Sequence, residues 1–142
     1  LNQLWARVTA EQDVAYQPDQ PLRGQMRQLL MAKMHTLGDE NFLNLARVAI
    51  AATLHSPERG QDMVARMNER EGGLTVWIRA AQADGRLKPV DPAFAAHQIQ
   101  GMLKSFAFWP QISLGLPSLE AAMQDQVVDS ALDMFLACYQ LA

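Results

Sequence analysis

Apolar residues recur at intervals of three and four along almost the whole chain, a spacing typical of amphipathic α-helices. Alternating polar and apolar runs, which would predict β-strands, are nearly absent. Prolines and glycines interrupt the helical spacing at several points, because proline cannot continue a helix and glycine weakens one. The sequence therefore predicts an all-α fold, an antiparallel bundle of about six helices in one domain of 142 residues.

Capping residues place the ends of these helices. Short polar or acidic side chains precede three of the apolar segments and are suited to cap them, namely Asp39, Asp91 and Ser118, while Pro92 suits a first turn and Pro110 an end. The expected helices are 1–16, 22–37, 41–55, 57–85, 91–110 and 118–141, and Gly72–Gly73 either bends or divides the fourth. The segment 41–55 is apolar on almost all sides, so we expect it to be central.

Composition excludes several classes of protein. The formal net charge is -3, whereas a domain that grips nucleic acid through its phosphates is normally basic. Cys138 is the only cysteine, so an intrachain disulfide is excluded and a reducing compartment such as the cytoplasm is expected. No run of about 18 apolar residues is present, and therefore no membrane-spanning helix is predicted.

The chain shows no pattern of catalytic or metal-binding residues. Its histidines, His35, His55 and His97, lie far apart, and none belongs to an E-x-x-H pair or has another histidine four residues away. Phosphate-binding glycine motifs and the G-x-S-x-G motif are absent. We therefore predict no catalytic residue, no metal site and no cofactor, and the chain is not expected to be an enzyme.

The last two expected helices carry apolar residues on more than one face. An amphipathic helix that serves one core needs an apolar arc of roughly 100°, and both helices exceed it. One interpretation is that each is buried on all sides in a single core. The other, which we favour, is that two helices from each subunit form a four-helix dimer interface that includes Phe94, Gly101, Phe108, Trp109, Val127, Ala131, Met134 and Cys138.

Methionines are plentiful along the chain, which has 8 of them, and aromatic residues such as Trp77 and Phe106 could form walls beside them. Methionine adapts its shape to varied apolar partners, although a methionine-rich core needs no ligand. A ligand pocket would combine such walls with a few polar groups. The residues expected to line it are Met31, Met34, His35, Val48, Ala52, Trp77, Gln98, Met102, Ser105 and Phe106.

The order of these signals resembles the C-terminal regulatory domain of TetR/AcrR-type bacterial transcriptional regulators, especially the AefR-like branch. The similarity covers most of residues 39–140. It rests on "LHSPERG" at the end of one helix, "AAQADGRLKPVDPAFAAHQIQGMLKS" across the next two, and a two-faced closing helix. The resemblance implies a dimeric repressor that releases DNA when a small apolar inducer binds.

It also implies a division of the chain. Residues 1–16 would be the remainder of a connecting helix, 21–90 would form the pocket and 91–141 the dimer interface. Operator DNA would be bound only through a helix-turn-helix domain preceding residue 1, which this chain lacks. An alternative that the residues leave open is a helical adaptor module, without a ligand, whose second apolar face binds a different protein.

Overall fold

The computed structural model describes residues 15–68 and 72–141. Within these ranges the chain is helical and contains no β-strand, which confirms the all-α prediction. The expected helix 1–16 lies outside the described residues, except for its last two positions. The helices are α2 (Leu22–Leu37), α3 (Glu40–His55), α4 (Pro57–Asn68), α5 (Gly73–Ala83), α6 (Pro92–Ala107), α7 (Trp109–Leu114) and α8 (Ala121–Tyr139).

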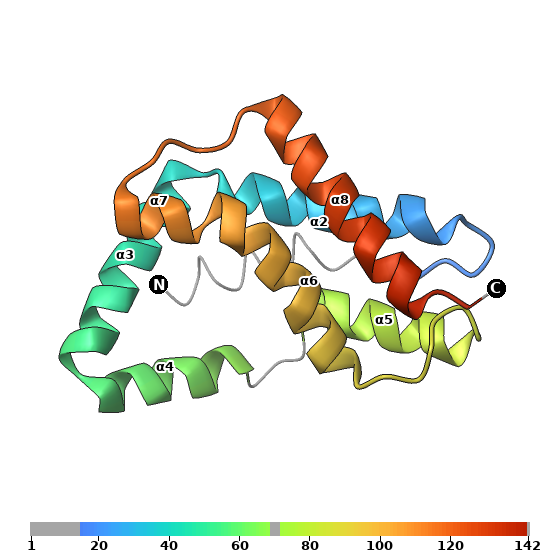
Figure 1. Cartoon of the computed structure of the whole chain (residues 1–142). Helices are drawn as coiled ribbons and strands as arrows, with labels where there is room; N and C mark the ends of the chain where they lie inside the picture. Colours follow the sequence, from blue (N-terminus) through green and yellow to red (C-terminus); the bar gives the residue numbers. More distant parts are fainter. Residues whose placement is uncertain (1–14, 69–71, 142) are drawn as a thin grey trace.

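Four helices surround the core (Figure 1). The helices α6 and α8 lie side by side and both contact α2, while α5 packs against α6. The largest side chains buried between them are Met26, Leu30, Met34, Trp77, Ile78, Ile99, Leu103 and Leu132. Burial of each such side chain contributes about 1.5–3 kcal/mol, so this core holds α2, α5, α6 and α8 together as one unit.

Two of the predicted N-caps are confirmed. The carboxylate of Asp39 accepts a hydrogen bond from the backbone N–H of Asn41 at 2.8 Å, and α3 begins at Glu40, directly after Asp39. Asp91 accepts from the N–H of Ala93 at 3.3 Å, with Pro92 in the first turn of α6. In both helices the side chain satisfies an N–H group that has no partner inside the helix.

The region after α6 differs from the prediction. Pro110 does not end α6, which finishes at Ala107, but lies in the first turn of the short helix α7, where its missing N–H costs nothing. Ser118 does not cap the last helix either. Its hydroxyl donates to the carbonyl of Gly38 at 3.1 Å, and α8 begins at Ala121. The Ser118 side chain therefore bonds to a distant part of the chain instead of forming the N-cap hydrogen bond that was predicted for the last helix.

The helix α3 lies at one edge of the molecule, so the prediction that segment 41–55 is central was wrong (Figure 1). Only Leu43, Ala46 and Ala49 of this helix are buried. Val48 and Leu54 remain 67% and 79% exposed. An apolar sequence on all sides indicates that a helix has several neighbours, but it does not say that the same chain provides them.

The segment 57–85 forms two helices, α4 and α5, and residues 69–71 between them lie outside the described part of the chain. Gly72 occupies the N-cap position of α5 in an extended conformation. Of the two expectations for this segment, division into two helices is therefore the one observed. This division lets α4 pack against α3 while α5 packs against α6.

The contact between α3 and α4 depends on Gly60. A methyl group at Gly60 would collide with the side chain of Thr53, whose hydroxyl donates to the carbonyl of Ala49. We therefore expect Gly60→Ala to lower the free energy of unfolding by about 1–3 kcal/mol, as overpacked sites do. Gly24→Ala is the matched control, because a methyl group there meets nothing within 4 Å. In urea titrations, Gly24→Ala should raise the free energy of unfolding by about 0.5–1 kcal/mol, because alanine favours a helix more than glycine does. Equal effects of Gly60→Ala and Gly24→Ala would contradict the close contact between α3 and α4.

Candidate functional site

The outward sides of α6 and α8 carry a row of exposed apolar and small residues. Phe94 and Met134 are each more than half exposed. We call this surface the α6/α8 face and define it by Phe94 and Gly101 on α6, by Met123, Met134, Ala137 and Cys138 on α8, and by Leu141. Large apolar side chains gathered on neighbouring helices mark an interaction surface more often than a chance exposure.

The residues expected at the dimer interface divide into two groups. Gly101, Cys138, Phe94, Trp109 and Met134 are exposed, and all except Trp109 lie on the α6/α8 face. The other three are covered by their own chain, with exposed fractions of 2–6%, namely Phe108, Val127 and Ala131. These three stabilise the monomer and offer no surface to a partner. The sequence pattern of α8 did not separate its inward stripe from its outward stripe, because both are apolar.

The buried face of α2 contains a lysine. Lys33 follows Leu29 and Leu30 by four and three residues and precedes Leu37 by four, and all three leucines are buried. Residues at these spacings share one side of a helix, so the stem of Lys33 lies among core residues. Burial, and to a smaller extent the positive charge of Lys104, lowers the pKa of the Lys33 ammonium from 10.5 to about 8.

The helix α6, which contacts α2, carries Lys104, whose charge acts on Lys33. The Nζ atom of Lys104 is 5.6 Å from the centre of the Phe108 ring, and burial lowers its pKa as well. The Phe108 ring in turn packs against that of Phe42 on α3, with 6.2 Å between ring centres. We call Lys33, Lys104, Phe42 and Phe108 the lysine–aromatic cluster. No carboxylate of the described residues lies within ion-pair distance of either ammonium group.

The residues expected to line a pocket do not come together at one place. Trp77 is buried beside the N-terminal half of α2, where its indole N–H donates to the side chain of Gln25 at 3.3 Å. Gln98 accepts a hydrogen bond from the Tyr139 hydroxyl at 2.5 Å and is exposed. His35, Val48, Ala52, Ser105 and Phe106 are also exposed, whereas Met34 is buried and Met31 and Met102 are partly buried against the core.

Two of the α6 residues of that set, Met102 and Phe106, point away from Lys104 of the lysine–aromatic cluster. Met102 and Phe106 are each two residues from Lys104, and two residues correspond to about 200° around a helix. These side chains therefore project from nearly the opposite side of α6. Sequence reasoning missed Lys33 and Lys104 because it chose other polar residues, His35 among them, for the pocket. Lys33 could have been recognised from the sequence, because it is a charged residue in the middle of the apolar stripe of the segment 22–37.

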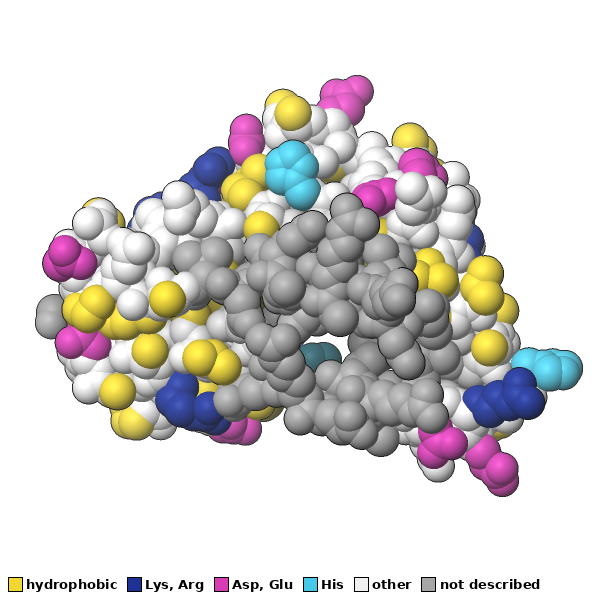
Figure 2. Space-filling view, turned by 180° about the vertical axis from the view of Figure 1, so that it is seen from behind, with side chains coloured by type: hydrophobic (Ala, Val, Ile, Leu, Met, Phe, Trp, Pro, Cys, Tyr) yellow, Lys and Arg dark blue, Asp and Glu magenta, His cyan; other side chains and the backbone are white. Residues whose placement is uncertain are grey.

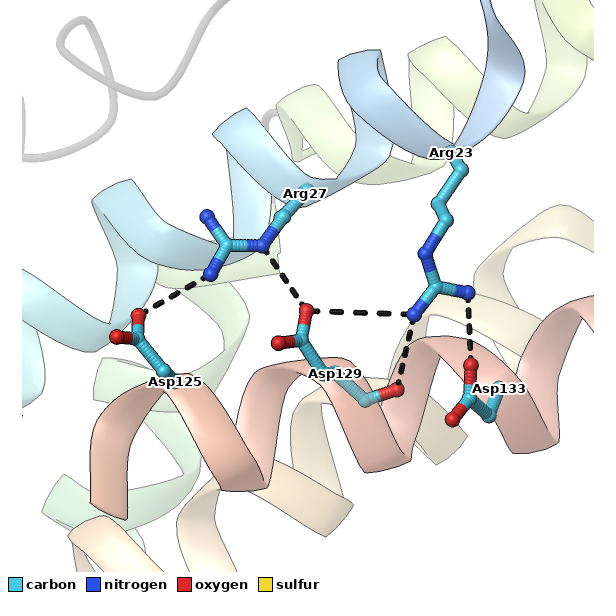
Figure 3. Close-up of polar contacts among 5 residues, drawn as sticks. All are labelled: Arg23, Arg27, Asp125, Asp129 and Asp133. Atoms are coloured by element: carbon cyan, nitrogen blue, oxygen red, sulfur yellow. Dashed lines mark hydrogen bonds and ion pairs between the residues drawn. The ribbon is translucent and has the colours of Figure 1, made fainter. Parts of the chain in front are cut away.

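A ladder of ion pairs joins α2 to α8 (Figure 3). Arg27 donates from Nε to Asp129 at 2.9 Å and from Nη2 to Asp125 at 3.1 Å. Arg23 lies 2.8 Å from Asp133 and also donates to the backbone carbonyl of Asp129. Both arginines and all three aspartates are spaced four apart on their helices, so the two rows face each other along one seam.

We expect Asp129→Asn to lower the unfolding free energy by about 0.5–1 kcal/mol, because these side chains are 39–68% exposed and exposed pairs contribute little each. The loss should disappear near 1 M salt, where the Debye length falls to about 3 Å. Asp19→Asn, at an exposed carboxylate outside the ladder, is the control and should have no effect. A loss at Asp129 that is the same at low and high salt would contradict an ionic origin.

The described residues form neither a continuous basic surface on the face shown in Figure 2 nor a metal-binding group. On the face shown in Figure 2, the coloured lysine and arginine side chains stand apart and form no continuous basic surface. Within residues 15–68 and 72–141, no group of three or more His, Cys, Asp or Glu side chains is placed to hold a metal ion. None of the helices in those ranges is long and apolar enough to cross a bilayer.

Comparison with known proteins identifies this arrangement. The family model of the AefR-like transcriptional repressor C-terminal domain matches residues 24–141. A TetR family transcriptional regulator from Pseudomonas syringae pv. tomato is 50% identical, with a TM-score of 0.84, and the match covers 99% of this chain and 74% of that one.

A second solved structure, from Mesorhizobium loti and assigned to the TetR family, is 23% identical with a TM-score of 0.75, covering 99% of this chain and 68% of that one. At this identity it supports the fold alone. No match is found among curated proteins. On the strength of the family model, the chain belongs to the TetR family of transcriptional regulators and carries the C-terminal domain of its AefR-like branch.

Proposed function

We propose that this chain is the effector-binding and dimerisation domain of a cytoplasmic bacterial repressor that releases its operator when a small, mainly apolar inducer binds. The match of the AefR-like C-terminal domain over residues 24–141 is the observation that carries this proposal. Operator binding would belong to a helix-turn-helix domain joined ahead of residue 1. The net charge of -3 supports this division, since a phosphate-binding surface is normally basic.

The α6/α8 face is the proposed dimer interface. Its apolar side chains are exposed in the single chain, and its small residues, Gly101 and Ala137, permit close approach of a second copy. Two helices from each subunit would then pack as a four-helix arrangement related by a two-fold axis. Residues 91–141, which include α6, α7 and α8, form the proposed dimerisation part, and residues 21–90 contribute most of the effector site.

The helix α2 is the proposed link between the two functions. Its C-terminal half carries Lys33 toward the interior, while its N-terminal half is tied to α8 by Arg23 and Arg27. An effector that displaces α2 would therefore also shift α8. Binding must favour one arrangement of the dimer over the other, and a coupling of about 1–3 kcal/mol changes operator affinity about 5–150-fold.

Two measurements test this function. Sedimentation equilibrium at micromolar concentration should give the mass of a dimer, and a strict monomer would contradict the proposed interface. A thermal-shift screen with a chemically varied panel of apolar compounds should raise the unfolding temperature for at least one chemical class. If the protein is a dimer and no compound shifts it, the adaptor interpretation replaces the effector-binding one.

A further inference from the structure

The C-terminal half of α2 and the helix α6 each carry a lysine in largely apolar surroundings, Lys33 and Lys104. The neighbours of Lys33 on its own helix are buried leucines, and Lys104 stands over the ring of Phe108. The Lys104 charge acts on Lys33, so the two ammonium groups repel each other. A core that needed only packing would have an apolar residue here, since an unpaired charge among apolar side chains is costly.

Acidic groups on the helices that pack against α2 are engaged elsewhere or exposed. Asp125, Asp129 and Asp133 of α8 pair with Arg23 and Arg27. At the start of α3, Asp39 caps its own helix and Glu40 is exposed. The helix α6 has no acidic residue and contributes the cation Lys104. The charges of the two lysines are therefore left without a counter-charge from these helices.

We propose that Lys33 and Lys104 form the anion-binding end of the effector site, and that the effector is a carboxylic acid with an apolar body. This inference rests on the proposed effector-binding function and specifies its ligand. Each ammonium group would donate to the carboxylate, and such charge-assisted bonds are strong where water is excluded. Phe42 and Phe108 would contact the part of the body nearest the carboxylate.

A monovalent anion fits this cluster better than a divalent one. Among the described residues, the cluster supplies two ammonium groups, enough for one donor to each of the two oxygens of a carboxylate. A phosphate monoester carries about two negative charges at neutral pH and is usually held by arginine forks or by several backbone N–H groups. Among the described residues, the cluster includes no arginine.

The test compares three probes that share one tail: decanoate, 1-decanol and decyl phosphate. Isothermal titration at pH 7 should give decanoate an affinity at least tenfold higher than that of decanol. Lys33→Met should remove this preference, and Lys33→Arg should retain part of it. Lys88→Met, at an exposed lysine on the loop before α6, is the matched control and should keep the full preference.

The outcomes separate this inference from the proposed function. If none of the three probes and no other apolar compound binds, the effector-binding function itself fails. If decanol binds as tightly as decanoate, or if Lys33→Met keeps the preference, the function stands and the anionic ligand is wrong. Tighter binding of decyl phosphate than of decanoate would overturn the choice of a carboxylate.

A ligand-independent measurement completes the test. The side-chain NMR signal of Lys33, assigned with Lys33→Arg, should titrate well below the ordinary range of lysine in the free protein. Its midpoint should rise when decanoate is bound, because the anion stabilises the charged form. An ordinary titration in the free protein would mean that the charge already has a partner or is fully hydrated, and would overturn the inference.

Discussion

Replacing Lys33 with methionine should make the protein more stable at pH 7, by up to about 3.5 kcal/mol. Burial lowers the pKa of this lysine from 10.5 to about 8, and each pH unit of such a shift corresponds to about 1.4 kcal/mol. Methionine has a similar length and no charge, so it would fill the same space among the leucines of α2 without the cost of a desolvated ammonium group.

The gain should depend on pH in a defined direction. Below pH 8 the native and the unfolded chains both hold the proton on Lys33, and the native state bears the whole cost of the buried charge. Between about pH 8 and 10.5 the native state loses this proton while the unfolded state keeps it, so the stability of the unmutated protein rises with pH. The advantage of Lys33→Met should therefore shrink across this window.

Urea titrations at fixed protein concentration between pH 7 and 10 measure both effects. Lys88→Met removes an exposed lysine and should change the unfolding free energy by less than about 0.5 kcal/mol at every pH. A Lys33→Met protein that is less stable than the original at pH 7 would show that the ammonium group has a favourable partner in the folded chain.

If Lys33→Met stabilises the fold, this result also supports a functional role for Lys33. Selection removes changes that impair function, and residues that weaken a fold are often kept at sites that act on a ligand. If Lys33→Met stabilises the chain and also abolishes the preference for decanoate, the loss of binding cannot be attributed to unfolding. The two measurements together would separate a structural role of Lys33 from a ligand-binding role.

The sequence predicted the helices well because their local signals agree with the tertiary structure. Asp39 and Asp91 cap the helices they precede, and the division near Gly72 follows from the weakness of glycine in a helix. The predicted helix boundaries are wrong at positions where the local signal in the sequence did not determine the structure. Ser118 bonds to Gly38, 80 residues away, and Pro110 begins a further short helix rather than ending α6.

The functional surfaces were harder to predict than the helices. Spacing along α8 identified apolar stripes on two sides, but only the packing of α6 and α2 against it decides which stripe is inward. Lys33 was overlooked because it stands inside an otherwise apolar stripe, and the polar residues predicted for the pocket, such as the exposed His35, lie outside that stripe. Its meaning depends on Lys104, 71 positions later, and no local pattern joins the two.

Met134→Glu should convert the proposed dimer into a folded monomer. Met134 is 53% exposed on the α6/α8 face, so a glutamate there stays hydrated in the single chain and should alter its unfolding free energy by about 0.5 kcal/mol or less. In the proposed two-fold symmetric dimer, the interface would bury the carboxylate introduced at position 134 of each subunit, and neither would have a counter-charge. We expect the dissociation constant, measured by sedimentation equilibrium, to rise about a thousandfold, which corresponds to about 4 kcal/mol.

Ala131→Glu provides the contrast, because Ala131 lies only three residues away on α8 but is 2% exposed inside its own chain. A carboxylate there would be buried without a partner in the monomer, so the variant should lose its cooperative unfolding transition and its helical circular dichroism. Val76→Glu, at an exposed position on α5, should leave both mass and fold unchanged. If Met134→Glu remains dimeric while Val76→Glu dissociates, the interface lies on another surface, and α6 and α8 would need a different partner.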